Sequence, residues 1–210
     1  RVIYNGVDFS LYEDTAIQQT FREKYQLGSQ RLITFLGVLG PHIDLDTMLE
    51  SIKFLADYPD VKVVFVSGGM QQEALVERLK QPEFTHCIAL DWIPAKEVPS
   101  FWAASYLTFW ALKDNELDSL RFQAKLYEAL ASGTPAIIAV EGFMSDLLAK
   151  TNTGLTVQSK DIKGMRGAIK ILLNDNALYH DMSHNARQYA LENFNPDDVA
   201  DRYETVLKTL

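Results

Sequence analysis

The stretch from Arg121 to Ala139 constrains the fold of this chain more than any other. Its first part places apolar residues at spacings of three and four among good helix formers, which predicts a helix. Gly133 suits the left-handed residue beyond a helix end, and Pro135 cannot continue a helix. The unbroken apolar run 136–140 that follows is typical of a strand buried on both faces of a parallel sheet. The stretch therefore predicts a helix that leads directly into an interior strand.

Apolar runs and amphipathic segments alternate along the rest of the chain. The runs predict strands at 32–37, 61–66, 87–90, 106–112, 136–140 and 154–157. The amphipathic segments predict helices at 15–26, 45–56, 72–80, 95–104, 143–150, 162–173, 178–193 and 196–210. This alternation predicts an α/β fold with a doubly wound, Rossmann-like parallel sheet, in which ligands bind beyond the carboxyl ends of the strands.

Composition and charge narrow the class of protein. The 210 residues suffice for one large domain. A net charge of −8 argues against general binding to nucleic acid, which needs a basic surface. The single cysteine, Cys87, excludes an internal disulfide, and no apolar run is long enough to span a bilayer. We therefore expect a cytoplasmic domain without nucleic-acid partners and without a membrane span.

Two charged residues share one face of the helix predicted before Gly133. Lys125 lies near the helix start, where unpaired N–H groups and the helix dipole attract phosphate. Glu128, one turn further, could accept two hydrogen bonds from a sugar diol. The alternative is a solvent-exposed Lys–Glu pair that stabilises the helix by about 0.2–0.5 kcal/mol. Spacing alone does not decide between the two interpretations.

The segment K-L-Y-E-A-L-A-S-G-T-P, from Lys125 to Pro135, resembles the signature of the retaining, glycogen-synthase-like (group 1) nucleotide-sugar glycosyltransferases. These enzymes have the GT-B fold of two Rossmann-like lobes, and the signature belongs to the C-terminal, donor-binding lobe. The segment V-I-Y-N-G-V-D, from Val2 to Asp8, resembles the family's junction between the lobes. The resemblance implies a junction with a first helix at 1–30, a donor-binding domain at 31–195, and a C-terminal helix at 196–210 that contacts the N-terminal lobe.

The resemblance also implies which residues contact the donor. Glu128 would hold the ribose hydroxyls, Lys125 would face the diphosphate, and the backbone of Ile93 would contact the nucleobase. Trp92 could line the base or belong to the core. The other expected contacts lie at strand ends and before the helix: Gly37, His42, Gly68, Arg121, Phe122 and Gln123. For His42, a solvated loop position is an equal alternative.

Three positions depart from the family pattern. Val38 and Ile43 stand where the family carries an arginine and a lysine that grip the diphosphate. Leu120 stands where the family has the first glutamate of its pair, and acidic residues in the preceding loop could replace it or be merely solvated. We infer that Lys125 carries the charge that the missing basic pair otherwise supplies. No catalytic residue is assigned.

The resemblance implies transfer of a hexose from a nucleoside diphosphate to an acceptor, with retention of configuration and without metal or cofactor. The partners would be the sugar nucleotide and the N-terminal lobe, through which the protein could meet a membrane surface. Without that lobe we expect nucleotide binding but little turnover. We also expect apolar surface left for that lobe among Tyr189, Phe194, Tyr203 and Leu207. The alternatives are a GT-B sugar-nucleotide epimerase and a non-catalytic binding or assembly module.

Overall fold

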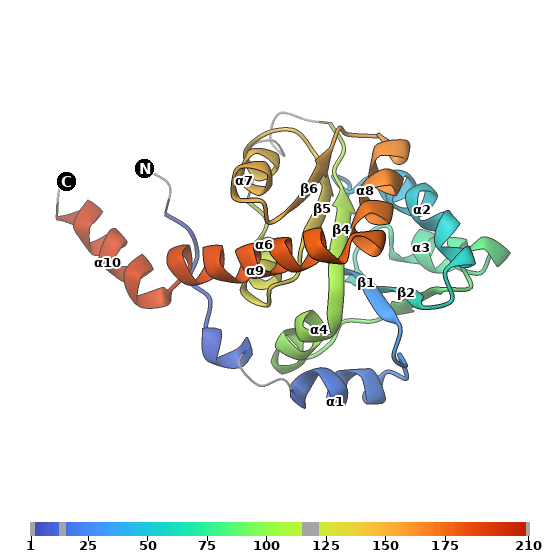
Figure 1. The fold of residues 1–210 in the computed structure, drawn as a ribbon, viewed down its shortest axis with the longest axis horizontal. Helices are drawn as coiled ribbons and strands as arrows, with labels where there is room; N and C mark the ends of the chain where they lie inside the picture. The colour runs from blue at the N-terminus through green and yellow to red at the C-terminus, as the bar shows by residue number, and fades with distance from the viewer. Residues whose placement is uncertain (1–2, 13–15, 115–121, 209–210) are drawn as a thin grey trace.

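A single sheet of parallel strands forms the centre of the computed structural model, which describes residues 3–12, 16–114 and 122–208 (Figure 1). The six strands lie in the order β3-β2-β1-β4-β5-β6. Their bounds are β1 (Arg31–Val38), β2 (Val61–Gly68), β3 (Cys87–Leu90), β4 (Ser105–Ala111), β5 (Ala136–Ala139) and β6 (Gly154–Val157). The predicted doubly wound α/β sheet is thus confirmed, and β5 is an interior strand between β4 and β6.

Helices cover both faces of this sheet. They are α1 (Ala16–Lys24), α2 (Leu45–Ile52), α3 (Gln72–Arg78), α4 (Val98–Ala104), α6 (Ala124–Ala131), α7 (Phe143–Thr151), α8 (Ile162–Asn174), α9 (Asn176–Asn193) and α10 (Pro196–Leu207). Short 3-10 helices lie at η1 (Phe9–Tyr12), η2 (Lys53–Asp57), η3 (Pro82–Phe84) and η4 (Ala95–Glu97). The helix expected at 95–104 begins as η4, and Pro99, which has no N–H to donate, lies in the first turn of α4.

Side-chain alternation along the central strand builds two hydrophobic layers. On β1, Ile33 and Phe35 belong to the cluster that includes residues of α2 and α8. Leu32 and Leu36 face the opposite way and pack with Phe21 of α1 and residues of α4. Because strand residues point alternately to opposite faces, a run of consecutive apolar residues can fill both layers.

The stretch from α6 to β5 folds as its sequence predicts. Gly133 follows α6 with φ +73°. Its N–H donates to the Leu130 carbonyl at 3.0 Å, and the Thr134 N–H donates to the Ala129 carbonyl at 2.8 Å. These two bonds satisfy carbonyls that the helix end would otherwise leave unpaired. The chain then enters β5, all of which is buried.

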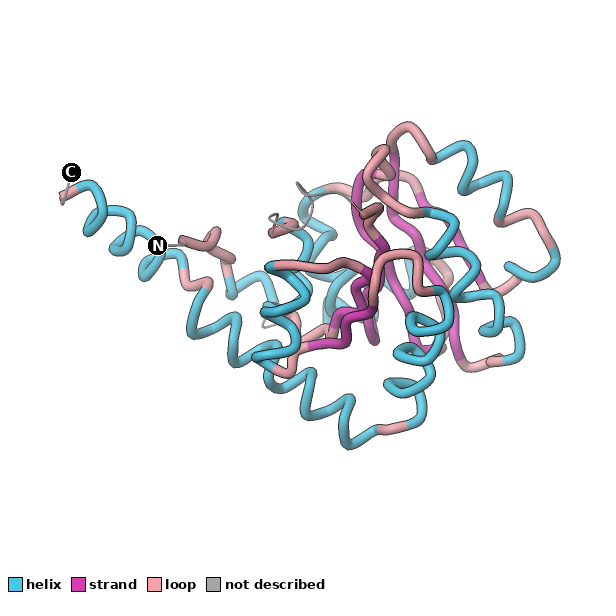
Figure 2. Tube along the Cα trace, turned by 90° about the horizontal axis from the view of Figure 1, so that it is seen from above, coloured by secondary structure: helices cyan, strands magenta, loops and turns pink. Residues whose placement is uncertain are grey.

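The N-terminal segment lies against the junction between α9 and α10. The Val7 N–H donates to the Phe194 carbonyl at 2.8 Å, and a Cβ at Gly6 would lie 2.9 Å from Cα of Pro196. From this contact α10 projects away from the body of the domain, as Figures 1 and 2 show. Tyr203 and Leu207 on α10 are 51% and 68% exposed. The expected apolar surface therefore lies at these two residues, since Phe194 is buried and Tyr189 is half-buried.

Two glycines allow a matched test of the turn that follows α6. Replacing Gly133 with Ala should lower the free energy of unfolding by about 1–2 kcal/mol, because the left-handed conformation disfavours a side chain. Its Cβ would also lie 3.2 Å from the Ser183 carbonyl oxygen. At Gly167 in α8 nothing lies within 4 Å of an added Cβ, so Gly167→Ala should stabilise by about 0.5–1 kcal/mol. Urea unfolding measures both changes. Equal changes in the free energy of unfolding for the two substitutions would contradict the requirement for glycine at the turn.

Candidate functional site

Lys125 reaches from α6 to the carboxyl end of β1. It is the second residue of α6, and its Nζ lies 4.3 Å from the ring centroid of Phe35 and 4.6 Å from that of Trp110. A Cβ at Gly37 would lie only 3.3 Å from this Nζ. Gly37 therefore leaves the space that the ammonium occupies, which gives two of the expected site residues one common location.

The Lys125 ammonium has no counter-ion within the described residues. No hydrogen bond or ion pair joins it to any group in those ranges, and only the faces of the two aromatic rings attract its charge. The residue keeps some exposed surface, but burial of the amine lowers its pKa from 10.5 to about 7. An anion at this position would supply the missing partner and favour the protonated form.

Glu128 lies one turn further along α6 and is half-buried. Its Oε2 accepts a hydrogen bond from Nε1 of the fully buried Trp102 at 3.0 Å. Burial raises the pKa of the Glu128 carboxyl, and the Trp102 hydrogen bond opposes that rise. Its Oε1 has no partner among the described groups and remains available as an acceptor.

The surface-pair alternative for Lys125 and Glu128 is wrong. No ion pair joins the two side chains in the described part of the chain, and neither side chain is fully exposed. Each instead contacts a buried tryptophan, Trp110 beside Lys125 and Trp102 beside Glu128. The two charged groups therefore lie in separate, partly apolar surroundings along the same helix.

A second group of residues lies where β2 and β3 end. A Cβ at Gly68 would overlap the indole nitrogen of Trp92, so glycine allows the close approach of that ring. Trp92 is 54% exposed, which makes its assignment to the core wrong. The side chain of Ile93 is buried, whereas its backbone N–H and C=O form no hydrogen bond with the described residues. The ring and the two free backbone groups are neighbours in the chain.

His42 and Phe122 lie in different surroundings. His42 is half-buried in the loop after β1, and its carbonyl accepts a hydrogen bond from the Lys113 N–H at 2.8 Å. The ring of Phe122 packs against Tyr127 at 4.2 Å and Tyr4 at 5.5 Å between centroids. Phe122 therefore joins the N-terminal segment to α6.

Gln123 immediately precedes α6 and is half-buried, and its side chain forms no capping hydrogen bond. Arg121, the remaining expected contact, lies outside the described residues, as does Leu120. Three acidic residues could replace the missing glutamate: Glu116 and Asp118 also lie outside the described residues, whereas Asp114 is described and exposed.

Val38 and Ile43 stand where the family carries basic residues, and one is exposed while the other is buried. Val38 is 54% exposed at the end of β1. Ile43 is fully buried and pairs with Leu112 through an isolated antiparallel bridge. Neither position supplies a cation, so the charge beside Gly37 comes from Lys125.

Trp102 and Trp110 contact the two charged residues of the site, and the sequence patterns do not predict these contacts. The helical and strand patterns around them predict only that they are buried. Nothing in those patterns pairs Trp102 in α4 with Glu128, or Trp110 in β4 with Lys125, because the contacts join separate elements.

Within the ranges that the structure describes, no group of three or more His, Cys, Asp or Glu side chains is arranged to hold a metal ion. Among the described helices, none is both long enough and apolar enough to cross a membrane.

Comparison with known proteins gives evidence on the family and the fold of the chain. Residues 17–189 match the family described as glycosyl transferases group 1. The chain is 27% identical over 228 residues to YtcC of Bacillus subtilis (strain 168), covering all of this chain and 54% of that protein. The curated relatives that it matches are thus about twice its length, since the chain spans 52–54% of them.

Solved structures share the fold. Anabaena HepE in complex with UDP has a TM-score of 0.83 at 19% identity, over 100% of this chain and 57% of that one. The C-terminal domain of the group 1 glycosyl transferase LpcC from Francisella tularensis has a TM-score of 0.71 at 19% identity. That match covers 90% of this chain and 99% of the LpcC domain. The likeness confirms the expected GT-B type of fold.

The lowered pKa of Lys125 predicts how stability depends on pH. Between pH 7 and 10.5 the unfolded chain binds a proton at Lys125 that the folded chain does not, so stability rises with pH across this window. The rise is at most about 1.4 kcal/mol per pH unit. Lys125→Met should therefore be more stable than the wild type at pH 7, and this advantage should shrink as pH rises.

Urea unfolding of both chains at several pH values between 7 and 10 measures the difference. Lys163→Met, which removes an exposed lysine of α8, serves as the control and should follow the wild type. A constant difference between Lys125→Met and wild type at all pH values would contradict the assignment of a lowered pKa to Lys125.

Proposed function

Because the chain belongs to the glycosyl transferases group 1 family, we propose that it is the donor-binding lobe of a glycosyltransferase. In this proposal a nucleoside diphosphate sugar lies at the carboxyl edge of the sheet. The observation that carries the proposal is the Lys125 ammonium, which stands beside Gly37 at the start of α6 without a counter-ion among the described residues. The bound UDP of Anabaena HepE supports the choice of a nucleotide ligand.

Lys125 is proposed to bind the diphosphate. The first turn of α6 presents unpaired N–H groups and the positive end of the helix dipole, and both attract phosphate. Protonated Lys125 adds a full charge at the same place. When the bond between sugar and phosphate breaks, negative charge grows on the leaving diphosphate, and these fixed positive groups stabilise it.

Glu128 is proposed to bind the ribose. One turn of helix separates it from Lys125, a spacing of about 5 Å along the axis. Its Oε2 is held by Trp102, and Oε1 can accept a hydrogen bond from a ribose hydroxyl. The indole hydrogen bond thus fixes the orientation of the carboxylate before the ligand arrives.

The nucleobase is proposed to lie beside Trp92. An exposed indole offers a flat apolar face on which a base can stack. The adjacent N–H and C=O of Ile93, which lack partners in the described ranges, could pair with the edge of the base. Base, ribose and diphosphate would then follow one line from β3 to α6.

The acceptor and the rest of the machinery are proposed to come from an N-terminal lobe of the same protein. The full match to the isolated C-terminal domain of LpcC and the half-length match to YtcC support this division. The exposed Tyr203 and Leu207 on α10 are the proposed contact surface for that lobe. Transfer of a hexose with retention of configuration is the proposed reaction of the complete enzyme.

Calorimetric titration of UDP and uridine tests the roles of the two charged residues. Lys125→Met should lower the affinity for UDP roughly ten- to a hundredfold, because loss of a charged hydrogen-bond partner costs about 1.5–3 kcal/mol. Uridine lacks the diphosphate, so its affinity should change little. Glu128→Gln should lower the affinities for UDP and uridine by similar factors, since both ligands carry the ribose.

The exposed Lys163→Met variant is the matched control and should bind UDP as the wild type does. Equal losses of UDP and uridine in Lys125→Met would contradict a diphosphate role for that residue. A folded wild-type chain that binds none of the UDP, GDP and ADP series would instead favour the non-catalytic binding or assembly module.

A further inference from the structure

A cavity lies at the amino edge of the sheet, opposite the candidate donor site. Its volume is about 290 Å³. Five segments line it: the last turn of α1, the segment before β1, the junction of α4 and β4, the turn after α6, and the first half of α9. Helix α6 thus begins at one site and ends at the other. Eight residues at about 1.5 Å each separate the two ends by roughly 12 Å.

Arg22 supplies an unpaired positive charge to this cavity. Its Nη1 donates to the carbonyls of Gly28 at 3.1 Å and Gln30 at 2.9 Å, and its Nη2 donates to the carbonyl of Ala104 at 2.9 Å. A guanidinium has five N–H donors, so these three bonds leave two. No carboxylate of the described residues forms an ion pair with Arg22. Burial lowers the pKa of its guanidinium.

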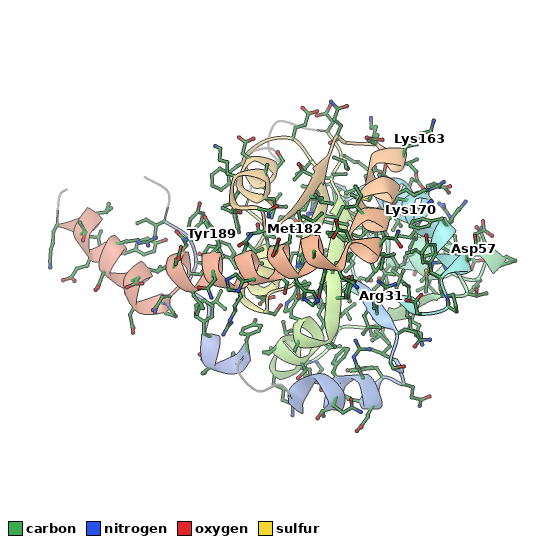
Figure 3. The ribbon with its side chains drawn as sticks, viewed as in Figure 1. Arg31, Asp57, Lys163, Lys170, Met182 and Tyr189 are labelled. Carbon is green, nitrogen blue, oxygen red and sulfur yellow. The ribbon has the colours of Figure 1, made fainter. Side chains whose placement is uncertain are left out.

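The other arginine of the cavity differs in this respect. Arg31 lies at the start of β1, below α9 in Figure 3, and its Nε donates to Asp60 at 3.1 Å. Its charge is therefore already balanced. Arg22, by contrast, has only carbonyl oxygens as partners among the residues that the structure describes.

Three hydroxyl groups of the cavity also lack partners. Ser29, Tyr179 and Ser183 line it, and their hydroxyls form no hydrogen bond within the described ranges. Tyr179 is held by stacking on Tyr106, with ring centroids 3.9 Å apart and an interplanar angle of 6°. Burial raises the pKa of Tyr179 to about 12, so its hydroxyl stays protonated and can donate. One unpaired guanidinium and several hydroxyl donors suit a ligand with several anionic oxygens.

We propose that this cavity binds a small phosphate-bearing molecule, with Arg22 as its counter-ion and the hydroxyls of Tyr179 and Ser183 as donors. The volume is many times the ~30 Å³ share of one water molecule and falls at the lower end of ligand pockets, about 300 Å³. Inorganic phosphate and a monosaccharide phosphate are both anionic, and both are small enough for a cavity of this volume. If the proposal is wrong, Arg22 only donates hydrogen bonds to the three carbonyls, and water fills the cavity.

Calorimetric titration of the whole chain with inorganic phosphate and with glucose 1-phosphate tests the proposal. Chloride at matched ionic strength and uncharged glucose are the control ligands. Binding should persist when UDP saturates the donor site and also in the Lys125→Met variant. It should fall at least tenfold in Ser183→Glu, which adds a carboxylate to the cavity that Arg22 lines. Tyr179→Phe removes a single hydroxyl, keeps the stacked ring, and should weaken binding severalfold.

The outcomes separate this cavity from the donor site. Tighter binding of glucose 1-phosphate than of phosphate would support a sugar phosphate, and the reverse order would support inorganic phosphate. Loss of binding in Lys125→Met, with Ser183→Glu and Tyr179→Phe unchanged, would place the phosphate at the donor site and overturn the proposal. It is equally overturned if millimolar phosphate and glucose 1-phosphate give no heat, or if uncharged glucose binds as well as its phosphate.

Discussion

The buried ammonium of Lys125 is the interaction on which the account of the donor site depends. It lies over the rings of Phe35 and Trp110, and Gly37, which has no side chain, leaves room for it. A cation without a counter-ion is costly in such surroundings, and the lowered pKa is the measure of that cost. A bound diphosphate would remove the penalty. The cost of burying the ammonium and its attraction for a diphosphate therefore have one cause.

The sheet determines where this cation lies. All six strands are parallel, so their carboxyl ends meet at one edge, and the helices that follow them begin there. The start of α6 is held in place because the helix leads through the Gly133 turn into β5, which is buried between its two neighbours. The same connection brings the end of α6 to the cavity at the opposite edge, where Arg22 forms no ion pair with any described residue.

Local sequence patterns predicted much of this structure, but they could not predict contacts between segments that are distant in the chain. The apolar runs located the strands, and Gly133 and Pro135 located the turn, because each signal is contained within a few residues. The same patterns could not place Trp92, which composition favours as core but which lies exposed beside Gly68. Nor could they reveal that a tryptophan of another helix holds Glu128, or that five segments enclose a polar cavity.

Proton uptake on UDP binding tests the central claim most directly. At pH 8 a lysine with a pKa of about 7 is mostly neutral in the free protein, and a bound diphosphate should return it to the charged form. Calorimetric titrations in buffers of different ionisation enthalpy count the protons exchanged. We expect uptake of about one proton per UDP in the wild type and almost none in Lys125→Met. Binding of UDP to the wild type without proton uptake would contradict it.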